Sequence, residues 1–109
     1  MKPTTFIVSA FLVLATVSSD SFAVVNVRGM SSCGGWLNRG TSELALMRQA
    51  WVIGYLSGRA AATDKDFLTG TDDATIFLWL DNFCRMNPNK DVEDGAAALA
   101  AELIWQKRL

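Results

Sequence analysis

The chain has no histidine, and its 109 residues include only two cysteines and two prolines. Without histidine, a cysteine nucleophile would lack its usual general base, and no Cys-x-x-Cys spacing is present to lower a thiol pKa. Two cysteines also cannot complete the usual tetrahedral zinc shell except with carboxylates. We therefore expect no thiol catalysis, no metal site and no cofactor.

An excess of positive charge is missing as well. When Lys2 and Asp20 are set aside, residues 24–109 carry nine basic and ten acidic side chains. A protein that binds DNA or RNA needs a cationic surplus to displace counterions from phosphates. We therefore expect no nucleic-acid partner.

Only one long apolar run occurs, and it lies at the start of the chain. Lys2 precedes "FIVSAFLVLATV", and in the following "SSDSFA" Ser21 and Ala23 fit a small-x-small cleavage site. The run is too short to cross a bilayer together with its flanks. These features predict a signal peptide over residues 1–23 and a periplasmic or secreted single domain over residues 24–109, with no membrane anchor after cleavage.

The two cysteines, Cys33 and Cys84, are the only available covalent staple. A domain of 86 residues obtains only a few kcal/mol from its hydrophobic core alone. In an oxidising compartment such a pair is typical of a disulfide, which would add about 4 kcal/mol in the chain-entropy model. We therefore predict that Cys33 and Cys84 are bonded.

The first of three predicted long helices begins after Thr41 or Ser42, which can cap its exposed amides, and ends near Gly58. Its apolar residues extend most of the way around the helix, so we expect it to be central and buried. Gly54 and Gly58 then indicate close approach of a neighbouring backbone, or a helix end at Gly58. Its predicted inner stripe is Leu44, Met47, Trp51 and Tyr55.

The second and third helices are marked by their own caps. The second has Thr71 or Asp72 as its N-cap and must stop before Pro88. The third starts at Asp91, with Asp94 in the position of a capping box. With a short helical segment around the first cysteine, the pattern predicts an all-α bundle. The predicted inner stripes are Ile76, Leu80 and Phe83, with Trp79 and Cys84 at the edges, and Val92, Ala96, Leu99 and Leu103.

The acidic residues offer two chemical alternatives. The linker aspartates do not follow the EF-hand spacing, so we interpret them as helix and turn caps instead of calcium ligands. Those aspartates are Asp64, Asp66, Asp72 and Asp73. Glu43 and Glu102 could act as a catalytic pair only if the fold placed them on one concave wall. We expect the protein not to be an enzyme.

Two apolar residues fall on faces that are otherwise polar. Leu78 projects between Asn82 and Arg85, and Trp105 projects away from the inner stripe of the last helix. One alternative is that the segment around Cys33 covers one of them. The other is that both are exposed contacts for a protein partner or for a second copy of this chain.

The chain contains, in this order, the segments "CGGWL", "WVIGYLSG", "WLDNFCRMNP" and an alanine-rich last helix. The order of these segments resembles that of small periplasmic one-disulfide helical proteins, such as the HdeA-like acid-stress chaperones. The layout is also similar to immunity proteins that neutralise type VI secretion amidases. For the chaperones, the resemblance implies a Cys33–Cys84 disulfide and a fold that acid opens to bind client proteins. For the immunity proteins, it implies a surface that inhibits a cell-wall-degrading effector. Both mechanisms act through protein contacts.

Overall fold

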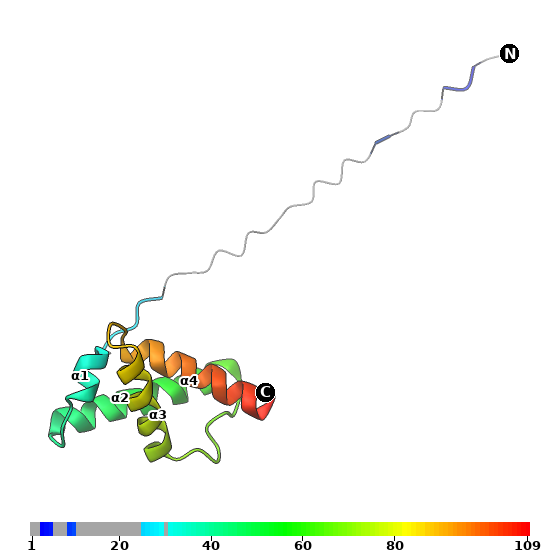
Figure 1. Cartoon of the computed structure of the whole chain (residues 1–109). Coiled ribbons are helices and arrows are strands. Elements are labelled where there is room, and N and C mark those ends of the chain that lie inside the picture. Colours follow the sequence, from blue (N-terminus) through cyan, green and yellow to red (C-terminus); the bar gives the residue numbers. More distant parts are fainter. Residues whose placement is uncertain (1–2, 6–8, 11–24, 30) are drawn as a thin grey trace.

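The structure is a computed structural model, which describes residues 3–5, 9–10, 25–29 and 31–109. This part of the chain forms helices and no strand (Figure 1), so the prediction of an all-α fold is confirmed. The helices are α1 (Cys33–Leu37), α2 (Glu43–Thr63), α3 (Asp73–Met86) and α4 (Val92–Lys107).

The predicted signal peptide falls almost wholly outside the described residues. Of residues 1–23, the structure describes only 3–5 and 9–10, so cleavage after Ala23 stays a prediction. Within the described part of the chain, none of the helices has the length and apolar character needed to cross a membrane.

The predicted caps of α3 and α4 are confirmed. The carboxylate of Asp72 accepts a hydrogen bond of 2.7 Å from the Thr75 backbone N–H, which caps the first turn of α3. Asp94 accepts a hydrogen bond of 3.1 Å from the Asp91 N–H in the capping box of α4. Helix α3 ends at Met86, two residues before the proline that prevents its continuation.

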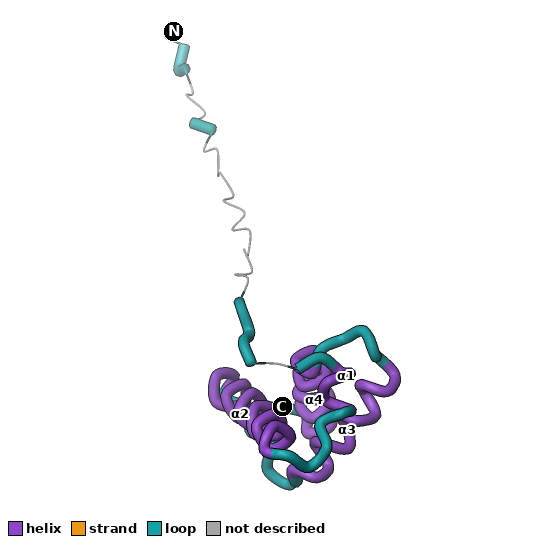
Figure 2. Tube along the Cα trace, turned by 90° about the vertical axis from the view of Figure 1, so that its left-hand side faces the viewer, coloured by secondary structure: helices purple, strands orange, loops and turns teal. Residues whose placement is uncertain are grey.

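The central helix is α4, which packs against both α2 and α3, while α1 packs on α3. Figure 2 shows α4 lying between its two long neighbours. Several of the buried α4 residues are Gly or Ala, which allow helices to approach closely on two sides. The buried residues are Val92, Gly95, Ala96, Leu99, Ala100 and Leu103, and they include the whole predicted stripe.

The prediction that α2 is central and buried is wrong. Only Ala45, Val52 and Leu56 of this helix are buried. Two residues of the predicted inner stripe, Leu44 and Met47, are exposed, as is Leu46, and Trp51 and Tyr55 are only partly buried. When apolar residues surround a helix, their pattern does not indicate which stripe is buried. Helix α2 packs mainly against α4, so only the stripe that faces α4 is buried.

The two predicted roles of the α2 glycines are also wrong. The helix continues past Gly58 to Thr63 and is capped by Asp64 in the left-handed conformation. A Cβ atom added at Gly54 or Gly58 would meet nothing within 4 Å. The close helix approach lies instead at Gly95, where an added Cβ would be 2.7 Å from the Phe83 Cδ1 atom.

Candidate functional site

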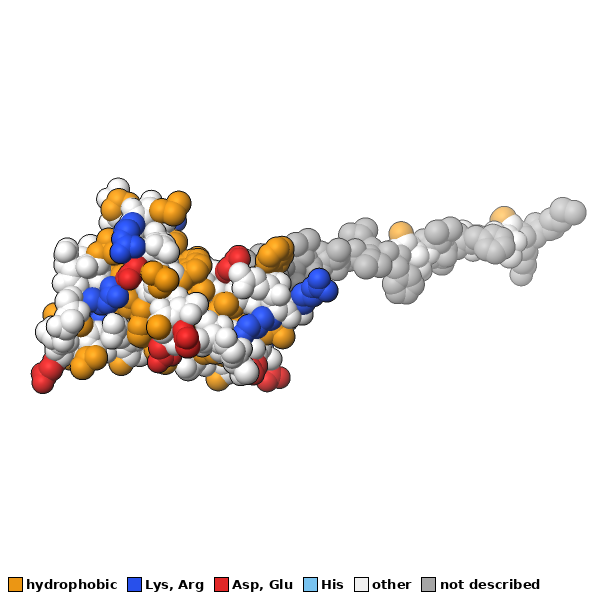
Figure 3. Space-filling model, turned by 60° about the horizontal axis from the view of Figure 1, so that its bottom comes forward, with side chains coloured by type: hydrophobic (Ala, Val, Ile, Leu, Met, Phe, Trp, Pro, Cys, Tyr) orange, Lys and Arg blue, Asp and Glu red, His pale blue; other side chains and the backbone are white. Residues whose placement is uncertain are grey.

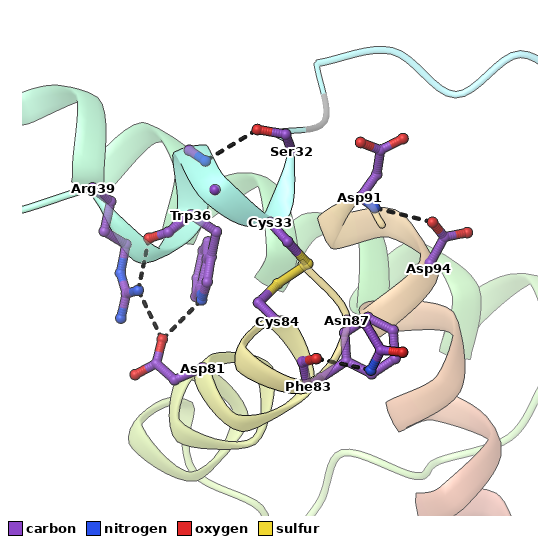
Figure 4. Close-up of a disulfide and its surroundings, with 12 residues drawn as sticks. Ser32, Cys33, Trp36, Arg39, Asp81, Phe83, Cys84, Asn87, Asp91 and Asp94 are labelled. Carbon is purple, nitrogen blue, oxygen red and sulfur yellow. Dashed lines mark hydrogen bonds and ion pairs between the residues drawn. A yellow bond between two sulfur atoms is a disulfide. The ribbon is translucent and has the colours of Figure 1, made fainter. Parts of the chain in front are cut away.

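The disulfide between Cys33 and Cys84 is confirmed, and it joins α1 to the last turns of α3 with the Cα atoms 4.9 Å apart (Figure 4). Both cysteines are fully buried, so Cys84 lies inside the core and not at the predicted rim. The Cys33 N–H also donates to the Lys90 carbonyl at 2.9 Å, and the Val92 N–H donates to the Ser31 carbonyl at 2.8 Å. The cysteine pair is therefore a structural joint and not a reactive thiol.

A polar contact closes the same joint. Trp36 is fully buried, and its indole Nε1–H donates to the Asp81 carboxylate at 2.9 Å. The Arg39 guanidinium donates to the same oxygen at 2.8 Å and lies 4.1 Å from the Trp36 ring centroid. Figure 4 shows the carboxylate placed between both donors. This face of α3, which we call the covered face, has its hydrogen bonds satisfied internally.

The opposite side of α3 carries an open pocket of about 350 Å³. We call it the α3 pocket. It is lined by Trp79, Asn82, Phe83, Met86 and Asn87. Met86 has 82% of its surface exposed, whereas the stacked rings of Trp79 and Phe83 are partly buried, with centroids 5.7 Å apart. The pocket therefore presents aromatic and thioether surface to solvent.

Gly95 allows one wall of the α3 pocket to lie close to α4. Because residue 95 has no side chain, Phe83 and Leu80 pack directly against the α4 backbone. Asn87 donates a hydrogen bond of 2.9 Å to the Phe83 carbonyl, which holds its own side chain beside the ring. The predicted stripe placed Phe83 in the core, but its ring is only partly buried because α1 covers the Cys84 side of α3 instead.

Two cations adjoin the α3 pocket. The Lys90 ammonium lies 5.9 Å from the Phe83 ring centroid, and Arg85 donates to the Asn82 side chain at 3.1 Å. None of the five described lining residues is charged. The pocket thus combines an apolar interior with a basic rim.

The predicted contact residues lie in different places. Leu78 is 57% exposed and lies one helical turn before Asn82, whereas Trp105 is 76% exposed on α4, and neither residue lines the α3 pocket. The alternative that the segment around Cys33 covers one of them is wrong. Both side chains are exposed, as the second alternative requires, and their role in binding stays a prediction.

Sequence reasoning missed most of the α3 pocket. Met86 follows Leu78 and Asn82 at helical spacing, and this periodicity could have placed Met86 on the exposed stripe. The pattern places Trp79 at the edge of the inner stripe, but the partial exposure of Phe83 had no such signal, because it depends on where α1 and α4 pack.

A second group of exposed apolar residues lies on α2. Leu44 and Met47 line a pocket with Trp51, whose indole N–H donates to the Arg28 carbonyl at 2.8 Å. This surface is thus partly occupied by the chain's own segment 25–29. Another hollow, of about 550 Å³, is lined mainly by polar side chains and backbone, namely Gly70, Thr71, Asp72, Thr75, Leu103 and Gln106.

Apolar side chains also reach the surface between separate acidic and basic ones on the face shown in Figure 3. This mixture of charges agrees with the balanced composition of the chain.

Two of the linker aspartates accept hydrogen bonds that hold turns or helix starts. Asp66 accepts hydrogen bonds from the Thr69 hydroxyl and backbone N–H, and these bonds lower its pKa. Hydrogen bonds from the Thr75 side chain and N–H likewise lower the pKa of Asp72. Within the described residues, no cluster of three His, Cys, Asp or Glu side chains could hold a metal ion.

The fold does not bring Glu43 and Glu102 together on one wall. Tyr55 of α2 donates to Glu93 near the start of α4, and Lys107 near its end donates to the Phe67 carbonyl beyond α2. The two helices therefore run in the same direction, which places Glu43 and Glu102 toward opposite ends. Burial raises the pKa of Tyr55; Arg59 opposes this effect and Glu93 adds to it.

No family model matches this chain, and neither a curated protein nor a solved structure was found to resemble it. The resemblance to HdeA-like chaperones and to immunity proteins therefore stays a prediction.

Proposed function

We propose that the protein is an exported protein-binding domain that acts through the α3 pocket and not by catalysis. The predicted signal peptide and the Cys33–Cys84 disulfide support export, because such bonds persist in oxidising compartments. In a Gram-negative cell that compartment is the periplasm.

The observation that carries the proposal is the exposure of Met86 in a pocket with aromatic walls, together with exposed Leu78 on the same helix. Full burial of each side chain by a partner would contribute on the order of 2 kcal/mol. Hot spots of protein interfaces are typically such apolar anchors in concave sites. The pocket is open in the folded domain, which favours binding near neutral pH, as in the immunity-type mechanism.

A second candidate is the acid-opened, HdeA-like chaperone. It is supported by the hydrogen-bonded carboxylates of Asp66 and Asp72, because hydrogen bonds lower the pKa of both groups in the folded state. Protonation of these two groups would remove that stabilisation, and the net charge of residues 24–109 would rise to about +9, which favours opening by repulsion.

Site-specific photo-crosslinking in periplasmic extract tests the proposal. A crosslinker placed at Met86 should capture a discrete partner near neutral pH, whereas one placed at Leu46, an exposed residue of α2, should not. A captured species of twice the mass would identify a second copy of this chain as the partner. Capture at Leu46 or Trp105 but not at Met86 would overturn the choice of the α3 pocket.

An aggregation assay separates the two mechanisms. If the acid-opened mechanism is right, the protein should suppress light scattering by a denatured client at about pH 3 and not at neutral pH. A fixed binding surface predicts the Met86 crosslink at neutral pH and no suppression in acid.

A further inference from the structure

We infer that the α3 pocket recognises an amphipathic protein segment whose apolar side chain is flanked by carboxylates. This inference rests on the proposed function and specifies the chemistry of the partner. It follows from the apolar lining and the charges at the rim, taken together.

The lining selects an apolar group. Trp79, Phe83 and Met86 form most of the described wall, and the two aromatic rings are stacked. A flexible, unbranched thioether such as that of Met86 adapts to different apolar shapes. The pocket is concave, so it accommodates a protruding side chain better than the plane of a membrane.

The rim selects negative charge. Arg85 and Lys90 contact different residues of the lining, Asn82 and the Phe83 ring respectively. The Asp94 carboxylate, in the first turn of α4, accepts a hydrogen bond from the Asp91 N–H of the capping box and is not among the lining residues (Figure 4). Carboxylates of a partner, placed one helical turn from its apolar anchor, would therefore complement both cations.

Selection from a peptide display library on the purified, oxidised full-length chain tests the inference directly. Enriched peptides should carry Asp or Glu within one turn of Leu, Met or Phe. Their affinity should fall at least tenfold in Met86→Glu and change less than twofold in the matched variant Leu46→Glu. It should also fall severalfold when the salt concentration is raised, because exposed charges are screened.

Charge reversal makes the test specific. The double variant Arg85→Glu/Lys90→Glu should lose the acidic peptides and, in a new selection, enrich basic ones with the same apolar anchor. Circular dichroism of each variant checks that it is folded. Peptides that depend on Met86 but show no acidic preference would overturn this inference and leave the proposed function standing.

Two other outcomes count against a protein partner. If no peptide is enriched by the wild-type chain, this inference is wrong, and the proposed function is wrong as well if the Met86 crosslinker captures no partner in extract. If the chain instead binds phosphatidylglycerol vesicles, and Arg85→Glu/Lys90→Glu abolishes that binding, the surface recognises anionic lipid.

Discussion

Both faces of α3 carry large apolar side chains, but one face packs against α1 and the other is open to solvent. On the covered face, Phe77 and Cys84 meet α1, and Trp36 packs against Phe77 at 5.8 Å between ring centroids. On the other side, Trp79 and Met86 line an open pocket. The difference shows that apolar content alone does not indicate burial. A face becomes core only where another element packs against it, and the uncovered face of α3 stays open to solvent.

Breaking the disulfide tests the covered face most severely. We expect Cys33→Ser/Cys84→Ser to lose about 4 kcal/mol of the free energy of unfolding, because the unfolded chain is no longer cross-linked. Urea unfolding followed by circular dichroism measures the loss. The wild-type chain in reductant is the control, and it should match the variant closely. An unchanged midpoint in both would show that the α1–α3 joint does not need its covalent bond.

The carboxylate at the same joint comes next. Asp81→Ala should cost about 2 kcal/mol, because the buried indole N–H of Trp36 loses its acceptor and Arg39 loses its ion partner. Asp81→Asn retains an acceptor for the indole and should cost about half as much. If both variants have the urea midpoint of the wild type, the contact of Asp81 with Trp36 and Arg39 does not contribute to the free energy of unfolding.

Gly95 tests the wall of the open pocket. Gly95→Ala should destabilise the domain by about 2 kcal/mol, since the new methyl group would overlap Phe83 and Leu80. It should also displace the Phe83 ring, which two-dimensional NMR of the aromatic protons would detect.

The matched control is Gly54→Ala on the exposed side of α2, where the added methyl group meets nothing. Alanine has the higher helix propensity, so this variant should gain about 1 kcal/mol. Equal effects of the two substitutions would contradict the close approach of α3 and α4.

The smallest effect concerns the start of α3. Because hydrogen bonds lower the pKa of Asp72 in the folded state, its ionised form stabilises the fold above the ordinary aspartate pKa. That contribution should be lost as the pH falls through the lowered folded-state value. Asp72→Asn keeps a capping side chain but cannot titrate, so the wild type should lose stability relative to it in acid. A constant difference between their urea midpoints down to about pH 2 would contradict this.

Much of the covered joint was predictable because few alternatives existed. With Cys33 and Cys84 as the only cysteines, the disulfide had one pairing. Helical spacing placed Leu78 and Trp105 on polar faces, but only the structure decided that the segment around Cys33 leaves both exposed. The indole contact of Trp36 with Asp81 was not predictable, because the two residues are 45 positions apart in the sequence.

By itself, the sequence determined where α3 and α4 begin and that α3 ends before Pro88, because capping and proline geometry act over a few neighbouring residues. Only the tertiary structure decided that α4 is central, that α2 is largely exposed and that Trp79 and Phe83 line a pocket. These features depend on contacts between distant segments, such as Gly95 against Phe83, which periodicity within one helix does not encode.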